Sequence, residues 1–192
     1  MARTDDLYEL PTDIPVPLDD GACRHLPGTA IAPCDLPSTR GRVVSLRDLS
    51  AEKRVVVYAY PRTGTPDRDP PEGWNQIPGA RGCTPQSCGF RDGYLELVSL
   101  GTEVFGLSTQ DTAYQQEAVE RLRLPFELLS DQHLQFIRAM RLPTFSVAGA
   151  VLLKRFTLVL RHGRVEKVFY PVFPPNENAA VVTRWLRTVE AQ

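Results

Sequence analysis

Continuous apolar runs that alternate with amphipathic segments are the main pattern of this chain. Residues 53–61 are mostly β-branched or aromatic and end at a proline, which predicts a fully buried strand. Residues 113–124 place apolar side chains at helical spacing and predict an amphipathic helix. The same criteria predict strands at 41–46, 102–109 and 125–131, helices at 84–101, 132–140 and 176–190, the last capped by Asn176, and a hairpin at 154–171 that turns at His162 and Gly163.

This order of elements predicts the fold class. Strands that alternate with helices, followed by a terminal hairpin and helix, indicate a three-layer α/β sandwich with a mixed central sheet. Residues 1–40 are rich in Pro, Asp and Thr with little periodicity, so we expect an irregular arm that lies over a single domain at 41–192. Residues 63–81 hold four prolines and three glycines and predict a loop.

Composition narrows the class of protein. At 192 residues and 42% hydrophobic content the chain is long enough for one well-filled domain. Lys and Arg number 22 against 23 Asp and Glu, so we expect no nucleic-acid partner and no anionic membrane surface as partner. The first 20 residues lack the apolar core of an export signal, and no apolar run approaches the roughly 18 residues of a membrane helix. A soluble, cytoplasmic protein is expected.

Two of the four cysteines, Cys83 and Cys88, lie five residues apart in "GARGCTPQSCGF". Four cysteines are too few for a secreted disulfide scaffold, and paired cysteines in a reducing compartment are more often catalytic or metal-binding. The free N–H groups at a helix start would stabilise a Cys83 thiolate. On an ideal helix the two Cα atoms would be about 8.6 Å apart, whereas a disulfide needs about 7 Å or less. Bridging would therefore require the first turn to unwind, as in a redox switch.

Five sequence blocks carry a family resemblance: "VVSLRDL", "VVVYAYPRTGTP", "GCTPQSCGFRD", "LPTF" and "KRFTLVLRHGRV". They resemble, in order, the peroxiredoxins of the bacterioferritin comigratory protein or peroxiredoxin Q type, over roughly residues 26–190. The resemblance implies a thioredoxin-like fold and a thiol peroxidase that reduces hydrogen peroxide and organic hydroperoxides. It implies that Cys83 becomes a sulfenic acid, that Cys88 resolves it as an intramolecular disulfide, and that thioredoxin or a similar dithiol protein reduces the disulfide.

The resemblance also assigns residues around the peroxide. Thr65, in the Pro61–Thr65 segment "PRTGT", would hydrogen-bond the thiolate and the peroxide, and Gly82 precedes the nucleophile. The Arg155 guanidinium would stabilise the thiolate and the leaving oxygen, whereas Lys154 is expected on the other face of the strand. No metal, flavin or haem is implied.

One departure from the family affects this assignment. Fifteen residues, Asp67–Arg81, separate Pro66 from Gly82, where relatives usually have none. Either the insertion bulges outward and leaves Thr65 in the site, or Thr65 is displaced. The insertion could gate peroxide access, shape a surface for the reductant or form a dimer contact, or it could be a tolerated surface loop.

Several alternatives stay open at this point. Cys23 and Cys34 could pair or accept electrons from Cys88, although we interpret them as packed hydrophobic residues. A zinc site at Cys83 and Cys88 is disfavoured because no second Cys/His pair follows at ligand spacing. A non-catalytic redox sensor or chaperone-like binding module could use the same disulfide. A dithiol oxidoreductase is disfavoured by the four-residue spacer. The protein could be a monomer or a dimer.

Overall fold

The computed structural model describes residues 6–190 and centres on a five-stranded mixed sheet in the order β5-β4-β3-β8-β9. The central strand, β3 (Arg54–Ala59), is buried along its whole length, in agreement with its continuous apolar sequence. It runs parallel to β4 and antiparallel to β8. The predicted α/β class with a mixed central sheet is therefore confirmed. The other strands are β4 (Thr102–Ser108), β5 (Glu127–Ser130), β8 (Phe156–Arg161) and β9 (Arg164–Phe169).

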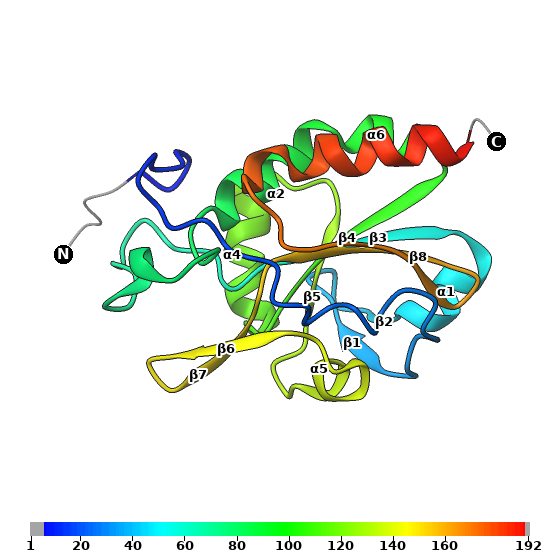
Figure 1. Ribbon diagram of the computed structural model, residues 1–192, viewed down its shortest axis with the longest axis horizontal. Coiled ribbons are helices and arrows are strands. Elements are labelled where there is room, and N and C mark those ends of the chain that lie inside the picture. Colours follow the sequence, from blue (N-terminus) through cyan, green and yellow to red (C-terminus); the bar gives the residue numbers. More distant parts are fainter. Residues whose placement is uncertain (1–5, 191–192) are drawn as a thin grey trace.

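Helices cover both faces of the sheet (Figure 1). One face packs against α2 (Cys83–Asp92), α3 (Tyr94–Ser99), α4 (Thr112–Leu122) and α6 (Asn178–Glu190). The opposite face packs against α1 (Leu46–Glu52), α5 (Gln135–Met140) and part of the first 40 residues. Helices α2 and α6 therefore lie on the same face of the sheet and contact each other.

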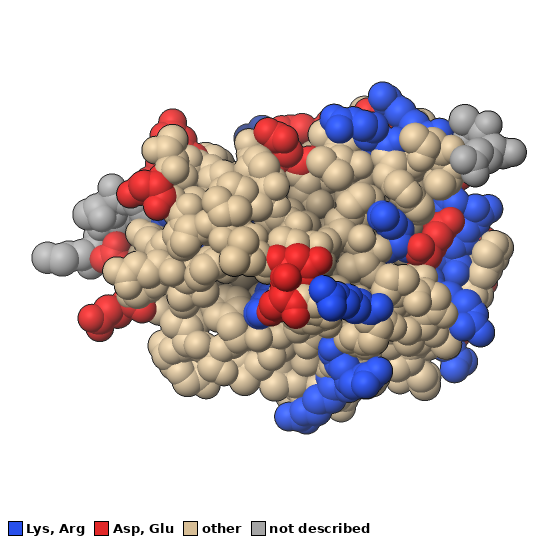
Figure 2. Space-filling model, viewed as in Figure 1, with Lys and Arg blue, Asp and Glu red and all other residues tan. Residues whose placement is uncertain are grey.

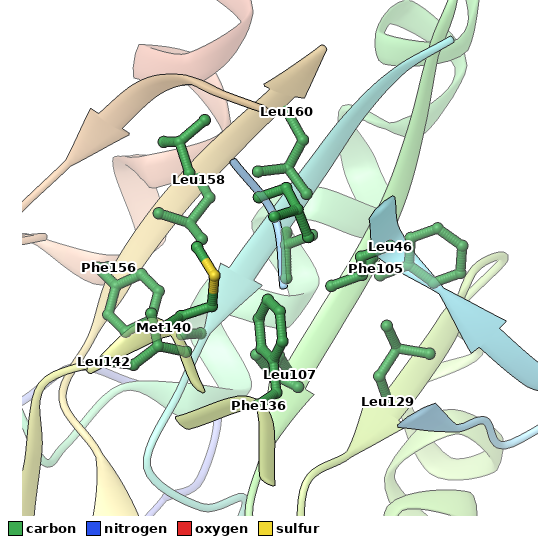
Figure 3. Packing of buried hydrophobic residues seen from close by; sticks show 14 of the residues in the cluster. Leu46, Phe105, Leu107, Leu129, Phe136, Met140, Leu142, Phe156, Leu158 and Leu160 are labelled. Atoms are coloured by element: carbon green, nitrogen blue, oxygen red, sulfur yellow. The ribbon is translucent and has the colours of Figure 1, made fainter. Parts of the chain in front are cut away.

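The side chains of β3 alternate between the two cores, as a pleated strand requires. Val55 and Val57 face the α1 and α5 side, while Val56 and Tyr58 face the α2 and α6 side. Figure 3 shows the first of these cores, in which Phe136 and Met140 of α5 lie among side chains of β4 and β8. The side chains of both cores are buried, so the sheet is packed on its two faces and positions the segments that follow its strands.

Part of the predicted arm is ordered against the domain. Within residues 1–40, β1 (Asp35–Pro37) pairs with β2 (Val43–Ser45), and Leu26 and Ile31 are buried. The Gly28 N–H donates to the Val165 carbonyl, which ties this segment to β9. Burial raises the pKa of Cys23, and nearby Asp20 raises it further.

Four local features differ from the sequence prediction. The predicted strand 41–46 ends at Ser45, whose hydroxyl accepts from the Asp48 N–H and starts α1. The predicted helix 84–101 breaks at Gly93 into α2 and α3. A hairpin that was not predicted joins β6 (Thr144–Val147) to β7 (Ala150–Leu153). Asn176 does not cap α6, because it lies inside the 3-10 turn η2 (Pro175–Glu177) that precedes this helix.

Figure 2 shows how charge is distributed on one face. Most Lys and Arg side chains there lie toward the end that carries the C-terminus, while Asp and Glu side chains lie at the opposite end, along the upper edge and near the centre. Among residues 6–190, no helix combines the length and apolar character needed to cross a bilayer.

Candidate active site

Cys83 is the first residue of α2 and follows a glycine with left-handed backbone geometry. Gly82 has φ 95°, and a Cβ at this position would collide with the Pro175 ring. Glycine is therefore required by both backbone conformation and space. The Gln86 N–H donates to the Gly82 carbonyl at 3.0 Å and closes the first helical turn. The Cys83 side chain is only 4% exposed and contacts the Ala80 carbonyl at 3.6 Å through Sγ.

Arg155 lies against the Cys83 sulfur. Its Nη2 is 3.2 Å from Sγ, and the residue is 3% exposed. The same nitrogen lies within 3.3 Å of three consecutive carbonyls, those of residues 79–81. Nη1 donates to the side-chain oxygen of Gln86. The guanidinium is thus fixed between the end of the insertion, the start of α2 and the sulfur.

A buried polar network continues from Gln86 toward α6. The Gln86 amide donates to Asn178 Oδ1 at 2.9 Å, and the Thr157 hydroxyl donates to the same oxygen at 2.7 Å. These side chains are almost completely buried. The network therefore links α2, β8 and α6 directly behind the Arg155 guanidinium.

Cys88 lies in the middle of α2, five positions after Cys83. Its side chain is partly exposed and packs against the same core as Cys83. Burial raises the pKa of the Cys88 thiol, and nearby Arg91 lowers it to a smaller extent. Both cysteines are free thiols on a continuous helix, the arrangement in which a bridge requires local unwinding.

Thr65 lines a pocket that opens over Cys83, together with Gly82 and Thr84. The chain before Thr65 is fixed by side chains of α4: the Tyr114 hydroxyl donates to the Thr63 carbonyl at 3.0 Å, and Arg121 Nη2 donates to the Gly64 carbonyl at 2.9 Å. The insertion consequently leaves Thr65 at the rim of the site. Within residues 6–190 the sulfur has two hydrogen-bond partners, the Arg155 guanidinium and the Ala80 carbonyl, and the Thr65 hydroxyl is not one of them.

The other residues named from the sequence lie near this pocket or away from it. Pro61 is buried just after β3, at the base of the segment that carries Thr65. Lys154 turns away from the sulfur and forms a 2.5 Å ion pair with Asp20. The residues described contain no group of three His, Cys, Asp or Glu side chains arranged to hold a metal ion.

The sequence did not indicate the supporting residues of the site. Gln86 stands inside the quoted cysteine motif, so its position was visible, but its partners were not. Asn178 and Thr157 lie 92 and 71 residues after Gln86 along the chain. Asn178 nevertheless accepts a hydrogen bond directly from the Gln86 amide. Only the folded structure brings them together.

Comparison with known proteins agrees with this architecture. The redoxin family model matches residues 26–183. Peroxiredoxin bcp1 of Schizosaccharomyces pombe is 34% identical over 113 residues, which are 59% of this chain and 50% of the relative. The chloroplastic peroxiredoxin Q of Sedum lineare is 31% identical over 164 residues, 85% of this chain and 78% of the relative. The matched region thus spans half the length of the yeast relative and most of the plant one.

Solved structures show the same fold. The crystal structure of peroxidoxin BcpB from Mycobacterium tuberculosis superposes with a TM-score of 0.70 and 26% identity, covering 86% of this chain and 99% of that one. The thioredoxin-like fold expected from the resemblance is therefore confirmed. With the family model matching well over half of the sequence, the chain belongs to the redoxin family and, within it, to the peroxiredoxins of the bacterioferritin comigratory protein and peroxiredoxin Q type.

Proposed function

We propose that this protein is a thiol peroxidase with a two-cysteine mechanism, in which Cys83 is the peroxidatic and Cys88 the resolving residue. The observation that carries the proposal is the 3.2 Å contact between Arg155 Nη2 and Cys83 Sγ at the start of α2. A fixed cation and free helix N–H groups beside a cysteine favour its thiolate, which is the nucleophilic form. Residues 41–192 form the peroxidase domain in this proposal, with 67–81 as its loop insertion and 1–40 as an arm.

The first step transfers one oxygen atom to sulfur. The Cys83 thiolate attacks the terminal oxygen of the hydroperoxide, the O–O bond breaks, and the sulfur becomes a sulfenic acid. The second oxygen leaves as an alkoxide or hydroxide, which takes up a proton to become an alcohol or water. Arg155 stabilises negative charge on the sulfur before attack and on the leaving oxygen during it. Thr65 and Gly82, at the pocket rim, orient the peroxide.

The second step forms the disulfide. The Cys88 thiol loses its proton and attacks the sulfenic sulfur, a sulfur–sulfur bond forms, and the sulfenic oxygen departs as water. Both cysteines lie on one helix, so the first turns of α2 must unwind for the sulfurs to meet. Rapid capture by Cys88 protects Cys83 from further oxidation to sulfinic acid.

The last step requires an external dithiol. In the proposal thioredoxin, or a similar dithiol protein in the cytoplasm, attacks the disulfide and returns both thiols while its own cysteines become oxidised. The protein needs no metal, flavin or haem for this cycle, because thiols supply all the electrons.

The experiment is peroxide consumption with a thioredoxin system, measured for the wild type, Cys83→Ser and Cys88→Ser, with mass spectrometry of each product. We expect many turnovers in the wild type and none in Cys83→Ser. The wild type should accumulate a Cys83–Cys88 bridge, and Cys88→Ser a sulfenic or sulfinic acid at Cys83. Consumption of a single equivalent by the wild type would instead favour the redox-sensor function.

A further inference from the structure

The insertion is a packed element rather than a loose loop. Trp74, in the 3-10 turn η1 (Trp74–Gln76), is 5% exposed and forms a small hydrophobic cluster with Ala80 and Leu152. Its ring centroid is 6.2 Å from that of Phe145. The insertion is thereby anchored to the β6–β7 hairpin. Its last three carbonyls surround the Arg155 guanidinium, so its far end is anchored as well.

The arm reaches the same place from the opposite side. Leu7 and Glu9 line the pocket over Cys83, and the Leu10 side chain lies against Gly82 at the start of α2. In Figure 1 the first described residues and the insertion lie at the same end of the molecule. We call residues 7–10 and 67–81 together the cap.

The cap leaves little space over the sulfur. Trp74, Pro70 and Pro71 line the pocket from the insertion. Its cavity volume is about 40 Å³. A single water needs about 10–15 Å³ of such space, so the space next to the sulfur accommodates only a few heavy atoms. Hydrogen peroxide fits there, whereas the branched alkyl or aromatic part of a larger hydroperoxide would have to pass between the side chains of the cap to reach a cysteine that is 4% exposed.

We propose that the cap, with Trp74 at its centre, makes the site selective for small peroxides over branched or aromatic organic hydroperoxides. In this proposal the insertion and residues 7–10 act together as a steric filter over Cys83. The inference rests on the proposed peroxidase function and concerns only which peroxides reach Cys83.

The test compares kcat/KM for cumene hydroperoxide with kcat/KM for hydrogen peroxide. Trp74→Ala is expected to raise the ratio of the two values at least tenfold, because it removes the largest side chain of the cap. The matched control is Trp185→Ala, since Trp185 is the other tryptophan and lies on α6, where it packs against Phe169 of β9. This control should leave the ratio within twofold of the wild type. An unchanged ratio in Trp74→Ala would overturn the inference.

A second variant tests the cap without disturbing a buried side chain. Leu7→Gly removes pocket lining contributed by the arm, where Leu7 is only partly buried. We expect a smaller rise of the same ratio, about threefold. An unchanged ratio in Leu7→Gly would contradict the part that the arm has in the cap.

A measurement independent of turnover separates this inference from the proposed function. In a Cys88→Ser background, Cys83 is alkylated with iodoacetamide and with a bulky aromatic maleimide, and the Cys83 peptide is quantified by mass spectrometry. Trp74→Ala should increase the rate with the maleimide at least tenfold relative to the rate with iodoacetamide. Turnover itself is measured in the proteins that keep Cys88, because Cys88→Ser is not expected to turn over. If those proteins show no peroxidase turnover, the increase supports the cap while the proposed function fails. No increase in a protein that turns over peroxide would contradict the cap alone.

Discussion

Arg155 and Lys154 are adjacent along the chain, yet their side chains have different partners. Arg155 is buried against the Cys83 sulfur, and Lys154 pairs with Asp20 at the surface. Both residues lie in the short connection between β7 and β8, so the alternation predicted for a strand does not apply to them; the backbone bends at Arg155, and the two side chains leave it toward different partners. The two residues therefore form a matched pair for testing the role of the cation.

Arg155→Lys is expected to lower kcat/KM for hydrogen peroxide by about 100-fold. A lysine keeps the charge but cannot bind the sulfur, the carbonyls of residues 79–81 and Gln86 at the same time. The measurement is the rate of Cys83 oxidation with peroxide in large excess over protein, so that the kinetics are pseudo-first-order. Lys154→Gln should stay within about twofold of the wild type, since an exposed ion pair contributes little. Equal losses in the two variants would argue against a special position of Arg155.

At the scale of single residues, the sequence identified the reactive groups but not the residues that hold them in position. Cys83, Cys88 and Arg155 belong to recognisable blocks, and the contact of Arg155 with Cys83 lies where those blocks suggested. Gln86 and Asn178 were not identified, because an amide reveals its function only through its partners. Of the two groups expected beside the sulfur, the Arg155 guanidinium contacts it, whereas the Thr65 hydroxyl lines the same pocket without a hydrogen bond to the sulfur in the described residues.

At the scale of elements, α2 has to be held firmly and yet be able to unwind. Its first turns carry both cysteines, and it packs against the 3-10 turn η2 and against α6. Gly89 makes the contact with η2 possible, because a Cβ there would lie 2.9 Å from the Asn176 carbonyl oxygen. The Gln86–Asn178 hydrogen bond is the polar part of this contact. Breaking it should shift the balance toward the unwound form.

Asn178→Ala is expected to accelerate Cys83–Cys88 disulfide formation after peroxide addition and to destabilise the reduced protein. The substitution leaves the Gln86 amide and the Thr157 hydroxyl buried without their acceptor, at a cost of about 1–3 kcal/mol for each group. Urea unfolding and quenched-flow thiol trapping measure the two effects. Asn176→Ala, two residues earlier and exposed, is the control. Slower disulfide formation in Asn178→Ala would contradict this view of α2.

Elements with strong periodicity were predictable, and those defined by contacts were not. The buried strand β3, helix α4 and the β8–β9 hairpin follow directly from apolar spacing and turn residues. Helix α1 was missed because its seven residues are too short for a periodic signal, so that only its Ser45 cap marks it. The β6–β7 hairpin lies outside the main sheet and is stabilised partly by the insertion, which no local pattern encodes.

At the scale of the whole molecule, the arm and the insertion meet over Cys83 although more than 50 residues separate them. This meeting depends on both cores of the sheet being in place, since each segment is anchored to a different side of the domain. The sequence predicted that both segments lie outside the helices and strands, but it did not predict that they contact the same pocket. Long-range packing of irregular segments has no periodic signature.

Stability of the whole molecule should decrease at alkaline pH. Burial raises the pKa of Cys23 from 9.0 to about 12, so this thiol stays neutral in the folded state while the unfolded chain ionises. Its contribution to stability is therefore complete below pH 9 and is lost as pH rises from 9 toward 12. Burial also raises the pKa of Tyr58, which adds to the loss at higher pH.

Urea unfolding at several pH values between 8 and 11 tests this expectation. The free energy of unfolding should fall with a slope that includes about 1.4 kcal/mol per pH unit from Cys23 above pH 9. Cys23→Ala should have a shallower slope in the same range. Identical slopes in the two proteins would show that Cys23 is not responsible.

The positions of the two tryptophans also provide an optical signal. Trp74 shares the pocket with Cys83, whereas Trp185 of α6 packs against Phe169 of β9. Oxidation of the sulfur and unwinding of α2 change the polarity and quenching around the first indole and leave the second in its hydrophobic setting. Intrinsic fluorescence of the unlabelled protein can therefore follow a catalytic cycle in real time, with Trp185 as the constant background and Trp74 as the reporter.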